Sequence, residues 1–249
     1  MKILVANPNT SAGVTQRLID SGRLVASVGT ELIAMTAPRG VPYIATRAEA
    51  AIGSAVMLEM LAERRGTMDA AIVAAFGDPG LGGARELFDF PVVGMAEAAM
   101  LVACTLGRSF SIVSFSKSLE PWFAEIVDWH GMTSRCAAIR MLDQSFRSID
   151  EVQEEKEQLL VDLANRTVAE NGADVVILAG APLAGLATKV RDRVPVPLVD
   201  GIQAAVVMAE GLVRLKPRKA TAGTYRRPGP KDSTGLAAPL ADVIGHRNA

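Results

Sequence analysis

The chain has 249 residues, of which 49% are hydrophobic and 21% charged, with 26 Lys and Arg against 27 Asp and Glu. This composition is typical of a globular enzyme, and a formal net charge of −1 gives no general attraction to nucleic acid or anionic lipid. We therefore expect a small-molecule ligand and neither a nucleic-acid nor a membrane partner. Two Cys and two His are too few for a disulfide framework or a soft-ligand metal cluster, so no metal is expected.

The N-terminal segment MKILVANPNT lacks the apolar length of a signal peptide. No stretch of the sequence reaches the roughly 18 apolar residues of a membrane span. The sequence therefore predicts a cytoplasmic protein. At this length, either one large domain or two smaller ones can bury a substantial core.

Short apolar runs alternate with longer amphipathic segments along most of the chain. The runs predict strands, in chain order, at Lys2–Ala6, Glu31–Thr36, Ala70–Phe76, Val92–Gly94, Phe110–Phe115, Ala137–Met141, Asp174–Leu178 and Leu198–Val199. Helical patterns follow most of these strands, as at Arg47–Arg64 and Glu151–Glu170. The alternation is typical of an α/β fold with parallel sheets, which bind ligands at the carboxyl ends of their strands.

The sequence also repeats itself. PVVG at 91–94 returns as PLVD at 197–200, about 106 positions later, and Ile72–Gly80 has a similar echo in Ile177–Gly185. A weaker echo relates Lys2–Thr10 to Phe110–Ser118. Chance is the alternative explanation, because buried parallel strands converge on Val-rich sequences. The common order favours two pseudo-symmetric α/β halves with parallel sheets flanked by helices and a ligand cleft between the halves.

The repeat predicts approximate boundaries for the two halves. Residues 1–105, together with a closing helix at 201–215, would form the first half, and residues 106–200 the second. The tail at 216–249 is rich in Lys, Arg, Gly and Pro and then places Leu236, Leu240 and Ile244 on one helical face. We expect this tail to leave the core. It is either an arm for a neighbouring subunit or ligand site, which would suit a homo-oligomer, or a flexible terminus.

The loop after the first strand offers polar groups to a ligand. Asn7, Asn9, Thr10 and Ser11 lie between this strand and a helix, where amide, hydroxyl and backbone N–H groups can hold a carboxylate or an amide. Capping of the helix by Thr10 or Ser11 is the structural alternative. Ser114, Phe115 and Ser116 end the equivalent strand of the second half and could contact the same ligand.

The loops after the repeated strands differ in their chemistry. FGDPGLGG at 76–83 carries one carboxylate, Asp78, which is either a general base or a helix cap. The equivalent loop at 179–185 has no ionisable side chain, so Gly180, Ala181, Pro182 and Leu183 can offer a ligand only backbone and space. Neither loop has the pattern of a nucleotide-binding site.

Further candidates are charged residues at helix starts. Glu97 and Asp200 lie near the starts of the two repeated helices, where they either move protons or stabilise the helix dipole. Arg47 is a candidate for binding a carboxylate, with a solvated helix start as the alternative. His130 has no identifiable partner, so we expect it to close a helix.

Six blocks resemble the aspartate/glutamate/hydantoin racemase superfamily, and within it the hydantoin racemase branch. These are, in order, ILVANPNTS, FGDPGLGGARE, PVVGMAEAA, FSIVSFS, ADVVILAGAPLAGL and PVPLVDGIQAAV. The resemblance covers roughly residues 1–215 and implies a cofactor-independent isomerase with its substrate between two α/β halves. It also implies two cysteines, one in each half, that exchange a proton on opposite faces of a carbon next to a carbonyl.

The sequence departs from this family pattern at both cysteines. The family block with Cys before Phe reads Ala75-Phe76, and the block Leu-Gly-Cys-Ala ends here in Gly180-Ala181. Cys104 falls inside a predicted helix and Cys136 at the start of another strand, so neither is expected to replace the missing thiols. The usual thiol mechanism cannot be carried over to this chain.

Three functions remain open from the sequence. The first is a cofactor-independent racemase or isomerase of a small hydantoin-like or amino-acid-derived compound, with proton transfer by Asp78, Glu97 or Asp200 in place of the cysteines. The second is a catalytically silent relative that binds a small carboxylate or ureide. The third is a lyase or hydrolase that uses bound water and one carboxylate.

Overall fold

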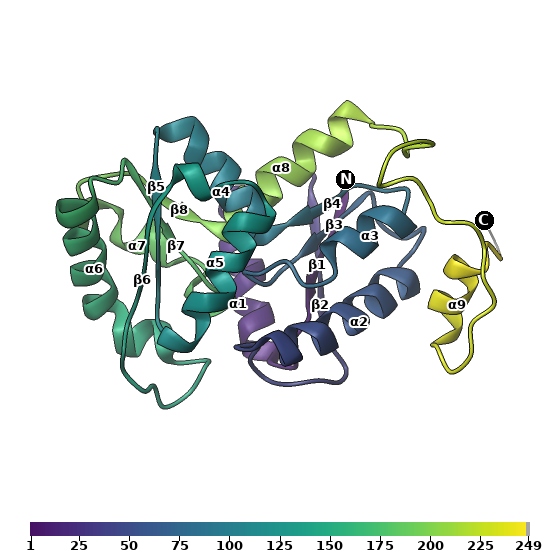
Figure 1. Cartoon of the computed structure of the whole chain (residues 1–249), viewed down its shortest axis with the longest axis horizontal. Helices are drawn as coiled ribbons and strands as arrows, with labels where there is room; N and C mark the ends of the chain where they lie inside the picture. Colours follow the sequence, from purple (N-terminus) through teal and green to yellow (C-terminus); the bar gives the residue numbers. More distant parts are fainter. Residues whose placement is uncertain (248–249) are drawn as a thin grey trace.

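The computed structural model describes residues 1–247, which form two four-stranded parallel sheets beside one another (Figure 1). The first sheet has the order β2-β1-β3-β4 and the second the order β6-β5-β7-β8, so the two halves share one topology. The strands are β1 (Lys2–Asn7), β2 (Glu31–Thr36), β3 (Ala70–Val73), β4 (Val92–Gly94), β5 (Phe110–Ser114), β6 (Cys136–Met141), β7 (Val175–Leu178) and β8 (Leu198–Asp200). The predicted α/β fold with two pseudo-symmetric halves is confirmed.

The pairing register relates the repeated segments. Val73 of β3 pairs with Gly94 of β4, and Leu178 of β7 pairs with Asp200 of β8. The echoes in the sequence therefore fall on strands with the same place and partner in their sheets. Because all strands are parallel, the loops that follow β1, β3, β5 and β7 leave each sheet at its carboxyl edge.

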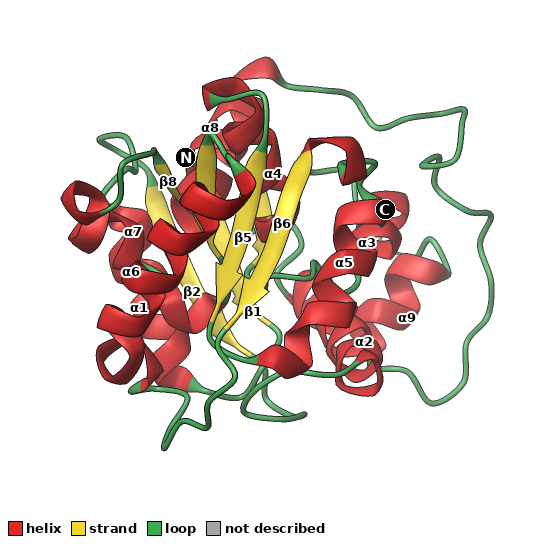
Figure 2. Cartoon of the chain, turned by 60° about the vertical axis from the view of Figure 1, so that its left-hand side comes forward, coloured by secondary structure: helices red, strands yellow, loops and turns green. Residues whose placement is uncertain are grey.

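Helices follow most of the strands and cover the sheets (Figure 2). They are α1 (Ala12–Arg23), α2 (Arg47–Glu63), α3 (Leu81–Leu87), α4 (Met95–Leu106), α5 (Glu120–Trp129), α6 (Val152–Asn171), α7 (Leu186–Val190), α8 (Gly201–Leu215) and α9 (Ala238–Ile244). Side-chain caps fix several of their starts: Ser11 accepts from Val14, and Thr46 forms a capping box with Glu49.

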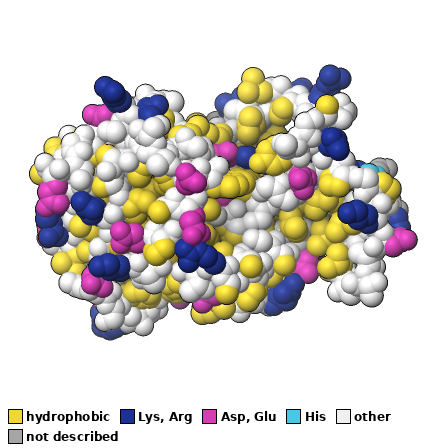
Figure 3. Space-filling model, viewed as in Figure 1, with side chains coloured by type: hydrophobic (Ala, Val, Ile, Leu, Met, Phe, Trp, Pro, Cys, Tyr) yellow, Lys and Arg dark blue, Asp and Glu magenta, His cyan; other side chains and the backbone are white. Residues whose placement is uncertain are grey.

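The core surrounds the central strands. β3, β5 and β7 are buried along their whole length, whereas the edge strands β2 and β6 are only half-buried. The surface carries basic and acidic side chains side by side on the face drawn in Figure 3. Within residues 1–247, no helix has both the length and the apolarity to cross a membrane.

Two strands end earlier than predicted. β3 ends at Val73 rather than Phe76, because its partner β4 has three residues and their pairing ends at Val73 and Gly94. β5 ends at Ser114, one residue before the predicted end. These early ends place Ala75, Phe76 and Phe115 in the loops at the carboxyl edge, where they can face a ligand.

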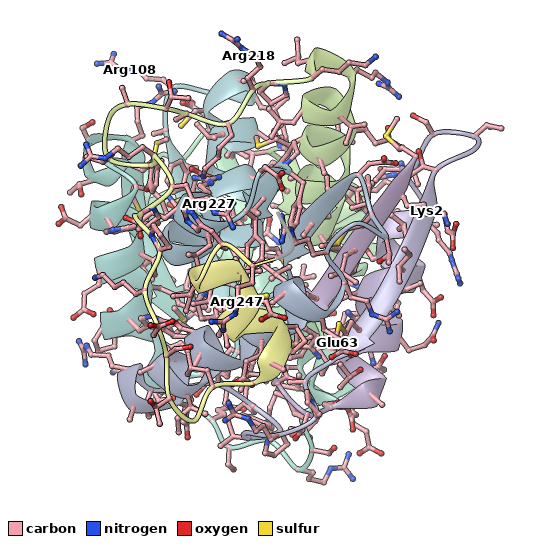
Figure 4. All side chains as sticks on the ribbon, turned by 90° about the vertical axis from the view of Figure 1, so that its right-hand side faces the viewer. Lys2, Glu63, Arg108, Arg218, Arg227 and Arg247 are labelled. Carbon is pink, nitrogen blue, oxygen red and sulfur yellow. The ribbon has the colours of Figure 1, made fainter. Side chains whose placement is uncertain are left out.

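The expectation that the tail leaves the core is wrong for its helix. α9 packs on α2, and Leu240 and Val243 are 4% and 1% exposed in a cluster with Met57 and Met60. Arg227 donates to the carbonyl oxygen of Val243 at 2.9 Å and ties the preceding segment to this helix (Figure 4). The predicted face is also corrected, because Leu236 precedes the helix and is exposed, and Val243 is buried instead.

We predict that the contact of α9 with α2 contributes to stability. Leu240→Ala should lower the free energy of unfolding by about 2–4 kcal/mol, because it removes buried methyl groups and leaves a cavity. Leu236→Ala, at an exposed position of the same tail, is the control and should change it by less than about 0.5 kcal/mol. Urea unfolding followed by circular dichroism measures both. Equal effects of the two substitutions would contradict a docked α9.

Candidate functional site

A cavity lies between the two halves at the carboxyl edges of the sheets. The first half contributes Asn9, Tyr43, Ile44, Ala75 and Phe76, and the second contributes Phe115, Leu119, Trp122, Phe123, Gly180, Ala181 and Pro182. Its volume of about 30 Å³ has room for one or two water molecules. A ring-shaped ligand therefore needs a movement of the lining side chains before it can enter.

Asn9 brings an amide to this cavity and is held in place by its neighbours. Its Oδ1 accepts from Asn7 Nδ2 at 2.9 Å and from the backbone N–H of Ser11 at 3.0 Å. Asn7 itself is fully buried and also donates to Thr15 Oγ1 at 3.0 Å. Because its oxygen is engaged, Asn9 offers the cavity its Nδ2 group, which is a hydrogen-bond donor.

The two positions that correspond to the family cysteines both line the cavity. Ala75 lies in the first half and Gly180 in the second, so the structure brings these loops together as the resemblance implies. Gly180 has a φ of +115°, a conformation that side chains rarely adopt, and a Cβ there would lie 3.0 Å from Phe115 Cε1. The backbone at this position is thus suited to glycine.

Tyr43 is the cavity-lining residue with a titratable side chain. Its ring packs against Phe115 and Phe146, with centroid distances of 5.7 and 6.0 Å. Burial raises the pKa of the Tyr43 hydroxyl, and the nearby Ser116 opposes this rise only in part. The hydroxyl oxygen is buried and has no hydrogen-bond partner of normal geometry within residues 1–247. Tyr43 is therefore a neutral donor at neutral pH.

The other predicted ligand contacts lie outside the cavity lining. Ser114 donates its hydroxyl to the carbonyl oxygen of Ala179 at 2.7 Å, and Ser116 pairs with Ser118 at 2.9 Å. Thr10 donates its backbone N–H to Val41 at 3.0 Å. Asn7 and Leu183 are buried behind the lining. Of the predicted substrate-binding set, the cavity is lined by Asn9, Phe115, Gly180, Ala181 and Pro182.

The three predicted proton-transfer carboxylates do not line the cavity either. Asp78 is buried and accepts the backbone N–H groups of Ala96 and Glu97, both at 2.9 Å, at the start of α4. Its φ of +47° lies in the left-handed region, which Asp tolerates better than most residues. Asp78 therefore acts here as the cap of a helix that lies 18 residues further along the chain.

Asp200 occupies the equivalent place at the start of α8. It accepts the backbone N–H groups of Ile202 at 3.0 Å and Gln203 at 3.2 Å, and the N–H of Gly185 from the second strand-end loop at 2.5 Å. Burial raises its pKa, and these hydrogen bonds, with one from Ser21, oppose the rise. Asp200 thus joins the start of a helix to the loop that carries Gly180.

Glu97 belongs to a charged cluster behind the first strand-end loop. It pairs with Arg85, and its Oε1 lies 3.7 Å from Nδ1 of His130. His130 Nε2 lies 3.0 Å from Asp78 Oδ2. Sequence analysis identified no partner for His130, because Asp78 is 52 residues away and comes from the other half.

Arg47 lies at the rim of the two halves and already binds a carboxylate. Its Nε lies 2.9 Å from each oxygen of Glu125 on α5, and the hydrogen bonds from Arg47 lower the pKa of Glu125. Both side chains are exposed. Arg47 does not line the inner cavity.

Sequence reasoning found Phe115 but missed the other aromatic residues of the lining, Tyr43, Phe76, Trp122 and Phe123. The chain has two Trp, two Tyr and seven Phe, and five of these residues line the cavity. The available signal was their concentration near β5 and α5, where Phe115, Trp122 and Phe123 lie within nine positions. Tyr43 and Ile44 follow no strand directly, so the rule of strand-end loops does not find them.

We predict that Gly180→Ala lowers the free energy of unfolding by roughly 1–3 kcal/mol, because the positive φ strains any side chain. Gly211→Ala is the control, since a Cβ there meets no atom within 4 Å. It lies inside α8, where replacing Gly by Ala should stabilise the protein by up to about 1 kcal/mol. Urea unfolding measures both variants. A neutral Gly180→Ala would show that the loop accepts a side chain without strain.

Comparison with known proteins identifies the family of the chain. The Asp/Glu/Hydantoin racemase family model matches residues 3–209. A hydantoin racemase of Paenarthrobacter aurescens is 34% identical over 92% of this chain and 98% of its own length. Another hydantoin racemase, from Rhizobium meliloti, is 31% identical over 94% of this chain and 98% of its own length.

Solved structures give the same result. An allantoin racemase from Klebsiella pneumoniae has a TM-score of 0.91 and 32% identity, covering 96% of this chain and 98% of its own. The allantoin racemase from Pseudomonas fluorescens has a TM-score of 0.87 and 33% identity, covering 94% of this chain and 100% of its own. These homologues support a racemase-type isomerase. The chain belongs to the Asp/Glu/hydantoin racemase family.

Proposed function

We propose that the protein isomerises a small hydantoin-like compound in the cleft between its halves, with proton transfer by groups other than cysteine. The observation that carries this proposal is the shared cavity, in which Ala75 and Gly180 lie where the resemblance implies two thiols. Relatives called hydantoin racemase and allantoin racemase support a cyclic ureide as the ligand. The proposal extends to a cytoplasmic, cofactor-independent homo-oligomer.

The reaction needs removal of the proton on the carbon next to a carbonyl and its return on the opposite face. Removal leaves an enolate, whose negative charge lies largely on the carbonyl oxygen, so a hydrogen-bond donor there lowers the barrier. We assign this role to Tyr43, because its buried hydroxyl has no hydrogen-bond partner of normal geometry within residues 1–247 and its raised pKa keeps it protonated. The Asn9 amide is a second donor on the cavity wall.

We assign the proton transfer itself to water or hydroxide beside Ala75 and Gly180. The cavity volume of about 30 Å³ has room for such water. Asp78, Glu97 and Asp200 are less suited to the task, since they lie outside the cavity lining and are held by helix N–H groups or by Arg85. Water is a weak base at neutral pH, so we expect slow turnover that rises with pH.

The second candidate function is binding without turnover. The specific observation in its favour is that Ala75 and Gly180 carry no acid or base. A silent relative of this kind would bind a ureide or small carboxylate and gain stability from it. A lyase or hydrolase with bound water is the third possibility, and it differs from an isomerase in the mass of its product.

We predict that the protein catalyses exchange of the α-proton. In deuterium oxide, the protein should exchange the α-proton of a 5-substituted hydantoin or of allantoin without mass loss, and the rate should rise with pH. The rise should continue beyond the ordinary Tyr pKa near 10, because Tyr43 stays protonated there. Proton NMR and mass spectrometry follow the reaction. Mass loss would indicate a lyase or hydrolase, and a raised Tm without exchange would indicate a binding protein.

A thiol reagent provides the control for this experiment. Treatment with iodoacetamide should leave the exchange rate unchanged, because neither Cys104 nor Cys136 lines the cavity and burial raises the pKa of Cys136 to about 11. Ala75→Cys is the positive control, since it places a thiol on the cavity wall. This variant should exchange the α-proton faster and become sensitive to the reagent. Loss of wild-type exchange on alkylation would contradict a thiol-free mechanism.

A separate prediction tests Tyr43. Tyr43→Phe should weaken binding of a hydantoin by roughly fivefold to tenfold, the value of one hydrogen bond of about 1 kcal/mol or slightly more. Binding of 2-imidazolidinone, which lacks the carbonyl next to the α-carbon, should not change. Isothermal titration calorimetry measures both ligands. Equal losses for the two ligands would indicate a packing role instead of a hydrogen bond to that carbonyl.

A further inference from the structure

Both tryptophans of the chain line a second, open groove next to the inner cavity. The groove lies between α2, α5 and the segment at 77–82, which comprises the loop after β3 and the start of α3, and its volume is about 360 Å³. This is within the usual range for sites that bind small molecules. Trp122 lines both spaces, so the groove and the cavity share one side chain as a wall.

One wall of the groove is apolar and comes from α5. Trp122, Ile126 and Trp129 follow one another at helical spacing and line the same side, and Trp129 is 53% exposed. The opposite wall is the glycine-rich loop, whose backbone approaches the indole rings closely. A Cβ on Gly82 would lie 3.6 Å from Trp129 Cζ2, and one on Gly77 only 2.2 Å from Trp122 Cζ2. The glycine backbone thus already contacts both indoles, and the exposed surface of Trp129 is the apolar surface left open to a flat ring.

The groove also contains a place for a carboxylate. Arg47 lies in its lining and binds Glu125 through two hydrogen bonds of its Nε, 2.9 Å to each oxygen, and a further one from Nη2. The side chains are 62% and 54% exposed, so water and solutes compete for this ion pair. The Glu125 carboxylate thus occupies the position that the carboxylate of a ligand would take.

We propose that this groove is a separate binding site for a small planar ring that bears a carboxylate. The ring packs against the exposed surface of Trp129, and the carboxylate replaces Glu125 on the Arg47 guanidinium. The choice of a carboxylated hydantoin as the ring rests on the proposed function, whereas the two walls and the cation do not. A ligand held here is separated from the inner cavity by the Trp122 side chain.

The experiment uses the emission of Trp129 as a reporter. In Trp122→Phe, Trp129 is the remaining tryptophan, so its emission reports on the groove and not on the inner cavity. Titration with hydantoin-5-acetic acid should change this emission in a saturable way. The neutral 5-methylhydantoin should bind about twofold to fivefold more weakly, which is the contribution expected for one exposed ion pair.

Two substitutions in the same background separate ligand binding from a structural effect. Arg47→Gln should weaken binding of the carboxylate probe about twofold to fivefold, to the level of the neutral probe. Glu125→Gln should strengthen it, because it removes the internal competitor for Arg47. Both substitutions break the same ion pair, so a purely structural effect would move the affinity in the same direction. Arg39→Gln, which breaks the exposed Arg39–Glu59 pair, is the control and should have no effect.

Two outcomes would overturn the proposal. One is an unchanged Trp129 emission in Trp122→Phe while the same probe raises the Tm of that variant, which would place the ligand in the inner cavity and leave the proposed function intact. The other is a loss of affinity in both Arg47→Gln and Glu125→Gln. A saturable Trp129 response with opposite effects of these substitutions, even without α-proton exchange, would support the groove and count against the proposed function alone.

Discussion

The geometry of the cleft depends on two buried carboxylates at the starts of α4 and α8. Both helices begin at the carboxyl edge of their sheet, where several backbone N–H groups lack partners within the helix. Asp200 caps α8 directly and also accepts the N–H of Gly185, so it fixes the loop that carries Gly180. In the first half the equivalent strand ends in Gly94, which has no side chain, and Asp78 reaches over from the preceding loop to cap α4. A Cβ on Gly94 would lie 2.4 Å from Asp78 Oδ2, so the small residue and the distant cap require each other. Both helices are thus capped by a buried Asp, which comes from the helix's own N-cap position in α8 and from a more distant loop in α4.

α5 joins the two halves across this edge. It follows β5 of the second sheet, yet its side chains pack on the first strand-end loop, with Phe123 4.8 Å from Phe76 between ring centroids. The ion pair of Glu125 with Arg47 and the contact of His130 with Asp78 tie the same helix to the first half at two further points. Trp122, on the same helix, lines both the inner cavity and the outer groove. One short helix therefore lines both the cavity and the groove and also holds the two halves together.

The chemistry of the cavity differs from that of a two-thiol racemase. Its lining is largely aromatic and aliphatic, with an oriented amide on Asn9 and a neutral hydroxyl on Tyr43 as its polar side chains. Such a lining offers hydrogen-bond donors but supplies no strong base. The glycine-only conformation at position 180 indicates that the second loop is adapted to its present residue, since a side chain there would be strained and close to Phe115. Restoring a thiol is structurally easier at Ala75, whose side chain already faces the cavity.

The sequence by itself determined the fold class, the repeat and the loops that meet at the cleft, because these follow from local periodicity and from the rule that parallel strands share one carboxyl edge. It also gave the two positions, Ala75 and Gly180, that lie on the cavity wall. Tertiary structure decided which neighbouring side chains face the cavity. Asn9 lines the cavity, and Asn7 orients the Asn9 side chain. Asp78 and Asp200 instead cap the helices α4 and α8. The cavity lining also includes Tyr43, Trp122 and Phe123, which do not directly follow a strand. In the tail, Leu240 packs against α2. These outcomes depend on contacts between residues far apart in the chain, which spacing and composition do not encode.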